Sequence, residues 1–246
     1  MTGAHDWLVP DWPAPRGVAS LITTRNGGVS SGAIASFNLS FNVGDCNDAV
    51  EKNRAQLRAH LPSEPHWLHQ VHGARVIEAG RETAPASADA SFTRERGAVC
   101  AVLVADCLPV LLCDDAGTVA GIAHAGWRGL SAGVIENTVQ RMNVAADRLL
   151  AFLGPAIGPG AFEVGAEVRD AFIARDPAAA RAFTEHADRK WLADLFLLAR
   201  LRLALCGVDR VYGGGLCTFS DARSWYSYRR ERNTGRMGAF IWLTAD

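Results

Sequence analysis

The chain has 246 residues, of which 49% are hydrophobic and 21% are charged, and its formal net charge at pH 7 is -1. A chain of this length and composition can bury a sizeable core as a soluble globular protein. Its near-zero charge gives no overall attraction to nucleic acid or to an anionic membrane, so neither is expected as a partner. The N-terminal residues lack a signal peptide, and no apolar run approaches the ~18 residues of a membrane span. We therefore expect a cytoplasmic protein.

The first half of the chain is expected to begin with an extended, proline-rich lead-in over residues 1–17 and a first strand over 17–25. A helix is expected over 47–61, because Asn47 is a residue type that caps helices and Pro62 cannot continue one. Apolar runs then predict strands over residues 67–71, 98–104, 110–113 and 118–123.

The second half of the chain alternates helical and strand patterns. Helices are expected over residues 130–142, 164–174 and 192–206, and strands over 150–153, 209–212 and 237–243. No linker composition and no repeat divides the chain, and the elements do not follow a strict βαβ period. The sequence therefore predicts one domain over residues 1–246, of the α/β or α+β class.

Three reactive side chains, His72, Cys107 and His124, each stand in a short polar segment at the end of an apolar run. From such positions a rigid scaffold presents groups to a cleft. Two imidazoles and one thiolate form a catalytic type of zinc set, because three protein ligands leave a fourth tetrahedral position for water or substrate. Taken singly, His72 suits a surface strand, His124 before a glycine turn is weak evidence of a site, and the cysteine suits a packed core position. Their combination favours a metal site.

The residues beside these three candidates indicate supporting roles. In an extended segment Gln70 and His72 would share a face, which places Gln70 where it can make a substrate or supporting hydrogen bond. Asp106 precedes Cys107, and both Asp106 and Gln70 are eligible proton donors by their positions in the sequence. Pro109 is expected to interrupt the strand, so the thiol of Cys107 should be accessible.

Other polar groups could contact a substrate. Arg128 lies where the chain enters a helix, whose N-terminal amide groups could bind phosphate with its help. In the string YSYRR, Tyr228 and Arg229 could stack on a base and pair with phosphate. Cys100 and Cys113 fit core positions, and all the cysteines are expected to be reduced.

Long strings along the chain add a second pattern. They run from about Thr23 to Leu243 and are TTRNGG, SFNLSFNVGD, WLHQVHG, SADASFT, VADCLPVLLCD, AHAGWRG, LGPAIGPGAFEVG, GGLCTFSD and YSYRRERNTGRMGAFIWL. In these strings the chain resembles the laccase-domain or polyphenol-oxidase-like family, which includes zinc-containing purine nucleoside phosphorylases and peptidoglycan editing factor relatives. The resemblance implies a layered α/β sandwich with mixed sheets and an active-site cleft.

The resemblance also implies a function. It implies phosphorolysis of adenosine, inosine, guanosine and methylthioadenosine, with deamination of adenosine as a second activity, so the partners would be purine nucleosides and phosphate. Zinc with an open position suits both reactions. The metal ligands would be His72, Cys107 and His124, which with Arg25 form the expected catalytic set. Substrate contacts would come from Gln70, Asp106, Arg128, Tyr228 and Arg229.

Two alternatives use the same residues. A copper-dependent polyphenol oxidase is one, since Cys and His also suit copper; however, multicopper oxidases rely on several His-x-His pairs, and the seven histidines of this chain form none. A cysteine amidase that edits peptidoglycan precursors is the other, with Cys107 as nucleophile and His124 as its base. The metal-ligand and nucleophile roles compete for the one sulfur of Cys107.

Overall fold

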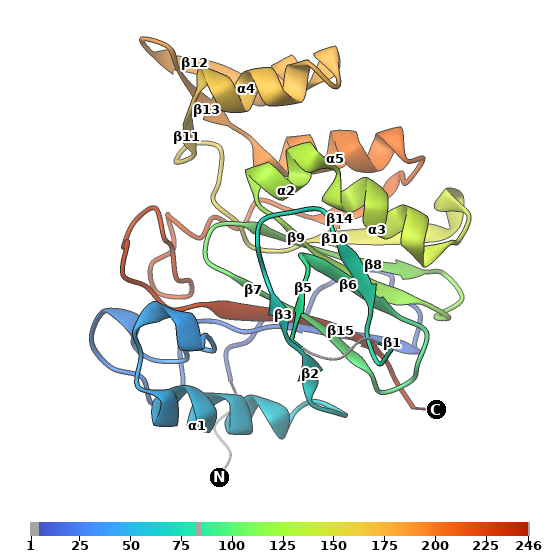
Figure 1. Ribbon diagram of the computed structural model, residues 1–246, viewed down its shortest axis with the longest axis vertical. Coiled ribbons are helices and arrows are strands. Elements are labelled where there is room, and N and C mark those ends of the chain that lie inside the picture. The colour runs from blue at the N-terminus through green and yellow to red at the C-terminus, as the bar shows by residue number, and fades with distance from the viewer. Residues whose placement is uncertain (1–4, 82–84, 246) are drawn as a thin grey trace.

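Two mixed β-sheets stacked face to face form the centre of the molecule, and helices cover both outer faces (Figure 1). The structure is a computed structural model that describes residues 5–81 and 85–245. One sheet has the strand order β1 (Val18–Ile22), β15 (Met237–Leu243), β7 (Val99–Val104) and β2 (Pro65–His66). The other has the order β14 (Arg210–Gly213), β10 (Leu149–Leu153), β8 (Leu108–Asp114), β9 (Ala120–Ala125), β6 (Ala90–Thr93) and β4 (Val76–Glu78). Parallel pairs at the sheet edges (β2–β7, β10–β14 and β4–β6) adjoin antiparallel ladders.

The inner strands are buried on both faces, which explains their nearly continuous apolar sequences. Along β8, Leu111 and Cys113 face the four-stranded sheet, whereas Val110 and Leu112 pack beneath the helices. Successive residues of a strand point to opposite sides, so one strand serves two cores. A strand packed on both faces is a rigid support for the side chains at its ends.

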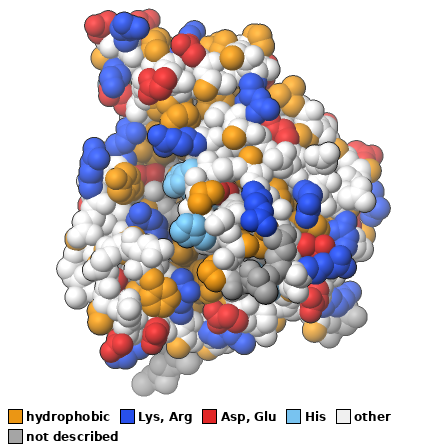
Figure 2. Space-filling view, viewed as in Figure 1, with side chains coloured by type: hydrophobic (Ala, Val, Ile, Leu, Met, Phe, Trp, Pro, Cys, Tyr) orange, Lys and Arg blue, Asp and Glu red, His pale blue; other side chains and the backbone are white. Residues whose placement is uncertain are grey.

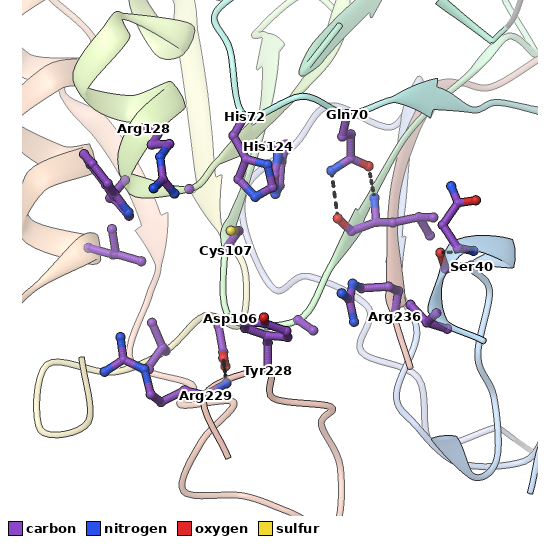
Figure 3. A pocket seen from close by; sticks show the side chains of 18 of the residues that line it. Ser40, Gln70, His72, Asp106, Cys107, His124, Arg128, Tyr228, Arg229 and Arg236 are labelled. Carbon is purple, nitrogen blue, oxygen red and sulfur yellow. Dashed lines mark hydrogen bonds between the residues drawn. The ribbon is translucent and has the colours of Figure 1, made fainter. Parts of the chain in front are cut away.

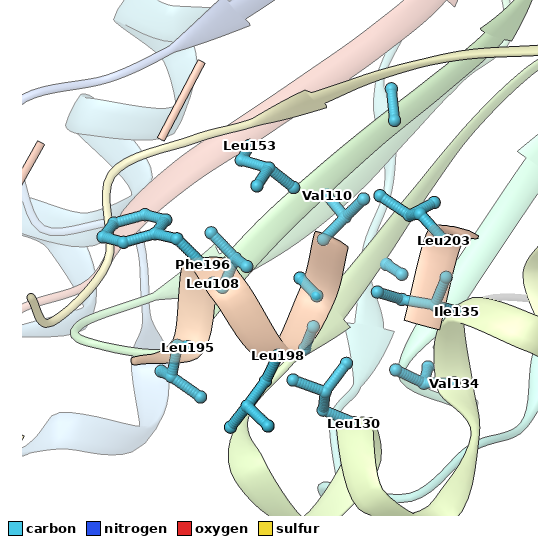
Figure 4. Packing of buried hydrophobic residues seen from close by; sticks show 14 of the residues in the cluster. Leu108, Val110, Leu130, Val134, Ile135, Leu153, Leu195, Phe196, Leu198 and Leu203 are labelled. Atoms are coloured by element: carbon cyan, nitrogen blue, oxygen red, sulfur yellow. The ribbon is translucent and has the colours of Figure 1, made fainter. Parts of the chain in front are cut away.

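Three helices cover the outer face of the six-stranded sheet: α2 (Trp127–Ala132), α3 (Val134–Met142) and α5 (Leu195–Leu205). Figure 4 shows the apolar side chains of this layer, where Leu130, Ile135 and Leu198 pack with Val110 of the sheet. On the far side, α1 (Asn47–Arg58) covers the four-stranded sheet. No helix in the described part of the chain is long and apolar enough to cross a membrane.

Smaller elements complete the fold. A lobe at one end of the molecule, at the top of Figure 1, consists of α4 (Ala166–Ile173) and the strands β11 (Glu163–Gly165), β13 (Lys190–Ala193) and β12 (Phe183–Ala187). The strands β3 (Leu68–His69) and β5 (Ala86–Ser87) form a short parallel pair. The 3-10 helices of the described residues are η1 (Gly32–Ile34), η2 (Phe41–Val43), η3 (Ala146–Arg148) and η4 (Pro177–Ala182).

The expected layered α/β architecture with mixed sheets is confirmed. Strand β15 covers the expected residues 237–243, and α1 begins at Asn47, although Cys46 rather than Asn47 is its N-cap residue. The helix expected over 130–142 is instead two helices. Gly133 separates them with a φ of 98°, a backbone conformation that glycine adopts without steric cost.

Two expectations close to the candidate metal ligands are wrong. Residues 67–71 do not form one strand, because the chain belongs to β3 only as far as His69. Pro109 does not interrupt its strand: it is the second residue of β8, lies opposite His124 in β9, and accepts a hydrogen bond from Gly154 N–H at its carbonyl (3.0 Å). Its position at the start of the strand is one that tolerates a missing N–H.

Candidate metal centre and its cavity

Three side chains with metal-binding atoms converge in one cavity (Figure 3). His72 comes from the loop after β3, Cys107 from the turn between β7 and β8, and His124 from β9. One ligand atom of each lies within 4.8 Å of the other two. His124 is buried, Cys107 is half-buried and His72 is exposed, so the set is open toward the cavity. Within residues 5–81 and 85–245 this is the one group of three or more His, Cys, Asp or Glu side chains with such spacing.

Asp89, a residue not expected at the site, holds two of the three candidate ligands in place. Its side chain is fully buried. One carboxylate oxygen accepts hydrogen bonds from Nδ1 of His124 (2.9 Å) and from the backbone N–H of His72 (2.8 Å). The other accepts from the N–H groups of Val71 (3.2 Å) and Gly73 (2.7 Å). With Nδ1 donating to Asp89, Nε2 of His124 remains as the ligand atom, the arrangement typical of zinc-binding histidines.

The same contacts set the charge of Asp89. Burial raises the pKa of this carboxyl group, but hydrogen bonds from His124 and from the backbone of Gly73 outweigh burial and hold the pKa below its ordinary value. Asp89 is therefore a carboxylate that orients the imidazole of His124 and stabilises positive charge on it.

The loop that carries His72 is fixed by Gln70 as well as by Asp89. The amide of Gln70 donates to the carbonyl of Leu103 (2.9 Å) and accepts from the N–H of Leu103 (2.7 Å), so it adds a strand-like contact to the edge of β7. His72 itself has a φ of 59°, in the left-handed region, and does not share a strand face with Gln70. Gln70 lines the cavity, and both ends of its amide bind the backbone, which is the supporting one of its two expected roles.

Asp106 is also committed to protein contacts. One oxygen of its carboxylate accepts from the Thr218 hydroxyl (2.6 Å) and the other from the N–H of Arg229 (2.6 Å). Its φ of 91° turns the chain sharply just before Cys107. Asp106 therefore lines the cavity, and its carboxylate connects three segments of the chain around the thiol. Both of its oxygens already accept a hydrogen bond from the protein.

The thiol of Cys107 lies in a different electrostatic environment from the core thiols. Burial raises the pKa of Cys100 to about 12, and both Cys100 and Cys113 are buried in the core as expected. Burial also acts to raise the pKa of Cys107, but the interactions with His124 and His72 outweigh it and lower the pKa. The thiolate is the form of cysteine that binds metals and attacks substrates. Cys107 is therefore the reactive thiol of this cavity.

The cavity around the three ligands measures about 620 Å³, within the usual size range of small-molecule sites. One wall is apolar and includes Ile157, Phe162 and Leu195. From the N-terminal part of the chain, Ser40 and Asn42 add polar groups to the lining, beside the apolar Val43. On the surface, histidine side chains lie in a hollow beside a gathering of Lys and Arg (Figure 2). The cavity thus offers an apolar region, polar groups and cations to one ligand.

All five residues expected to contact substrate line this cavity: Gln70 and Asp106, described above, and Arg128, Tyr228 and Arg229. Arg128 is exposed, and its guanidinium carbon lies 4.5 Å from the centroid of the Trp127 ring. Tyr228 is 48% exposed, which leaves its ring available for stacking. Arg229 lines the cavity, but its guanidinium donates to the carbonyl of Glu163 (3.0 Å) in β11.

Arg25, expected to be catalytic, does not line the cavity. Its guanidinium donates to the carbonyl of Ala35 through two nitrogens (3.3 and 3.2 Å) and to the carbonyl of Ala222 (3.2 Å). It also lies over the ring of the buried Tyr226, 4.8 Å from its centroid. Arg25 therefore connects two loops. A different arginine, Arg236, lines the cavity, although it was not among the site residues expected from the sequence.

Gly126 provides a direct test of the packing around the thiol. A Cβ atom at this position would lie 2.7 Å from Sγ of Cys107 and 3.3 Å from Cδ2 of His72. We expect Gly126→Ala to displace the thiol and to weaken zinc binding by at least ~10-fold, measured by competition with a chromogenic chelator.

Gly160→Ala is the matched control for this substitution, because a Cβ atom there has no described atom within 4 Å. It should bind zinc as tightly as the unmodified protein. Equal zinc affinity of the two variants would show that the thiol position does not control metal binding.

Fold and site together define a class: a mixed α/β sandwich protein with a candidate metal site of two histidines and one cysteine that opens to a cavity of small-molecule size. Residues 19–244 match the family described as multi-copper polyphenol oxidoreductase laccase, and the chain belongs to this family. The resemblance seen in the sequence is thereby confirmed.

Relatives with related sequences carry a different functional name. The chain is 53% identical over 239 residues to the Escherichia coli (strain K12) protein named purine nucleoside phosphorylase YfiH, covering 96% of this chain and 98% of the relative. A Pseudomonas aeruginosa protein also named as a purine nucleoside phosphorylase is 52% identical over 238 residues, with the same coverage.

Solved structures agree with the fold. A crystal structure of a Neisseria meningitidis protein assigned to the family DUF152 superposes with a TM-score of 0.94 at 49% identity, covering 98% of this chain and 100% of that chain. The crystal structure of YlmD from Geobacillus stearothermophilus gives a TM-score of 0.91 at 31% identity, covering 100% and 98%.

Proposed function

We propose that this protein is a cytoplasmic, zinc-dependent purine nucleoside phosphorylase that acts on adenosine, inosine, guanosine and methylthioadenosine and also deaminates adenosine. The observation that carries the proposal is the convergence of His72, Cys107 and His124, supported by Asp89, inside a cavity of about 620 Å³. The names of the relatives support phosphorolysis of purine nucleosides. The whole chain, residues 1–246, would act as one domain.

The donor set fits zinc. Two imidazole nitrogens and one thiolate are ligands that zinc prefers, and three ligands leave a position for water or substrate. A bound zinc ion supplies a Lewis acid at that position, which suits both deamination and phosphorolysis. The orientation of His124 by Asp89 is the supporting contact that zinc-binding histidines usually have.

Copper fits less well. A single copper bound by two His and one Cys takes a weak axial ligand such as Met or Gln. Met142 and Met237, the methionines in the described part of the chain, are buried in the core and do not line the cavity. The Gln70 amide is held by Leu103. Coupled copper ions would need further ligand groups, and the described residues contain one.

In phosphorolysis an oxygen of phosphate bonds to C1′ of the ribose while the bond from C1′ to the purine nitrogen breaks. The bonding electrons leave with the base, which takes up a proton, and the products are ribose 1-phosphate and the free purine. The apolar wall of Ile157, Phe162 and Leu195 suits the purine, and the exposed ring of Tyr228 offers a further substrate contact beside Arg236. Cationic groups stabilise the phosphate nucleophile and keep it in position.

A second candidate function rests on the contacts of His124 with Cys107 and with Asp89. Cys107, His124 and Asp89 are arranged like a nucleophile, a base and a carboxylate that orients the base. An amidase with a Cys107 nucleophile would use this arrangement. It gives no role to His72, which interacts with the same thiol from the cavity side, so the metal site explains more of the geometry.

Removal of the metal separates these functions. We expect purified protein to release hypoxanthine from inosine only when phosphate is present, to lose at least ~10³-fold of this activity after chelation, and to regain it with zinc. The measurement is hypoxanthine formation in a coupled assay, with copper added in parallel. Full activity of the chelated protein on an amide would instead establish the cysteine hydrolase, and copper-dependent oxygen uptake with a phenol would establish the oxidase.

A further inference from the structure

The cations of the cavity differ in how strongly the protein already uses them. The cavity is lined by three arginines, Arg128, Arg229 and Arg236. The guanidinium of Arg229 is directed to backbone carbonyls of Ala161 (3.5 Å) and Glu163 (3.0 Å). Arg128 is exposed at the surface over the Trp127 ring. The third arginine, Arg236, is half-buried.

Arg236 is held in position by hydrogen bonds from its backbone N–H and from its guanidinium. Its backbone N–H donates to Oδ1 of Asn38 (2.9 Å), an amide that is itself fully buried. One terminal nitrogen of its guanidinium donates to the carbonyls of Thr234 (2.9 Å) and Gly235 (3.0 Å). The other nitrogens, Nε and Nη2, have no hydrogen-bond acceptor within the described part of the chain, and the side chain forms no ion pair there. A positioned fork of N–H donors thus faces an open cavity.

Partial burial of the Arg236 guanidinium is energetically unfavourable, and a bound anion would offset this cost. Arg236 is half-buried, and burial lowers its pKa even though the nearby Cys107 and Asp106 act in the opposite direction. A partly desolvated guanidinium with two free donors is the group that binds phosphate most effectively, because its planar fork matches two phosphate oxygens.

The position of Arg236 also suits the reaction geometry. Arg128 and Arg236 approach the metal ligands from opposite sides, with Ser40 on the side of Arg236 (Figure 3). The apolar residues Phe162 and Leu195 belong to the core cluster under α2, the helix that carries Arg128. Displacement at C1′ requires the nucleophile and the departing base on opposite faces of the ribose. A base against the apolar wall therefore places phosphate on the side of Arg236.

We propose, on the basis of the phosphorolysis proposed above, that Arg236 is the residue that binds the phosphate co-substrate, with Ser40 and Asn42 beside it and the purine on the opposite side toward Phe162 and Leu195. The phosphate-binding role expected from the sequence for Arg128 is thereby assigned to Arg236.

The test compares steady-state constants of the zinc-loaded full-length protein and of Arg236→Gln, Arg236→Lys and Arg128→Gln. We expect Arg236→Gln to raise the KM for phosphate at least ~10-fold and to change the KM for inosine less than twofold, since charge-assisted hydrogen bonds to one substrate are lost. Arg236→Lys should give an intermediate KM for phosphate, because it keeps the charge but not the fork. Arg181→Gln, an exposed arginine outside this cavity, is the charge-matched control.

Two results would overturn the inference. One is an equal rise of both KM values in Arg236→Gln together with a lower melting temperature, which would mean a structural role. The other is a larger rise of the phosphate KM in Arg128→Gln than in Arg236→Gln.

A binding measurement keeps the inference separate from the proposed function. Inorganic phosphate is titrated into zinc-loaded protein by calorimetry in the absence of nucleoside. If the protein shows no phosphorolysis but binds phosphate, and Arg236→Gln weakens binding at least ~10-fold, the phosphate site stands and the proposed function fails. Absent phosphate binding, or equal binding by both proteins, would reject the site.

Discussion

Replacing Cys107 by alanine is expected to remove zinc from the protein and to lower phosphate-dependent hypoxanthine release by at least ~10³-fold, about 4 kcal/mol of transition-state stabilisation. The physical reason is that the thiolate is the anionic member of the three-ligand set, and two imidazoles alone hold zinc weakly. Zinc content by mass spectrometry and activity on inosine are measured on the same preparation. Both should fall together.

Cys46→Ala is the control for the loss of a thiol. Cys46 is exposed at the start of α1 and makes no side-chain capping hydrogen bond, so zinc content and activity should stay unchanged. A Cys107→Ala variant that keeps full zinc content but is inactive would contradict a ligand role and would favour the thiol as a nucleophile.

The second large effect is expected from Asp89→Ala. The substitution leaves Nδ1 of His124 and the N–H groups of Val71, His72 and Gly73 without their acceptor. We expect zinc affinity to fall by ~10- to 100-fold and the free energy of unfolding to fall by about 3 kcal/mol. Zinc affinity is measured by chelator competition, and stability by urea denaturation of the metal-free protein.

Asp114→Ala separates the two effects. Asp114 is equally buried and accepts hydrogen bonds from Thr118 N–H and hydroxyl groups (both 2.6 Å) and from Val119 N–H (3.0 Å), in the turn between β8 and β9 at a distance from the ligands along both strands. It should lower stability to a similar degree and leave zinc affinity within twofold. A comparable loss of zinc affinity in both variants would mean that Asp89 acts only through stability.

The sequence predicted the inner part of the fold better than its edges. The strands β7, β8, β10 and β15 are buried on two faces, so each is a continuous apolar run that can be seen in the sequence. Edge strands such as β4, with three residues, lack a run of this length and were not expected. The break between α2 and α3 depends on one residue, Gly133, within an otherwise helical pattern.

At the site, the sequence indicated the candidate metal ligands by their side-chain chemistry but did not indicate their hydrogen-bond partners. His72, Cys107 and His124 are types that bind metals, and each follows an apolar run. Asp89 lies in the string SADASFT, where its carboxylate could have been noticed, but its role depends on the antiparallel pairing of β6 with β9, which brings it next to His124.

The arginines show most clearly the difference between what local sequence and what tertiary contacts reveal. Arg25 and Arg236 are both cations in strings shared with the family, and no local pattern distinguishes them. Three-dimensional contacts do: backbone carbonyls and Glu231 occupy the guanidinium of Arg25, whereas Arg236 keeps two donors free toward the cavity. Which charge is available to a substrate follows from tertiary structure alone.

X-ray absorption at the zinc edge tests most directly whether His72, Cys107 and His124 together bind one zinc ion. The account predicts close to one zinc per chain, with one sulfur at about 2.3 Å and two imidazole nitrogens at about 2.0 Å in the first coordination shell. A first shell without sulfur, or fully active protein that contains no metal, would contradict it.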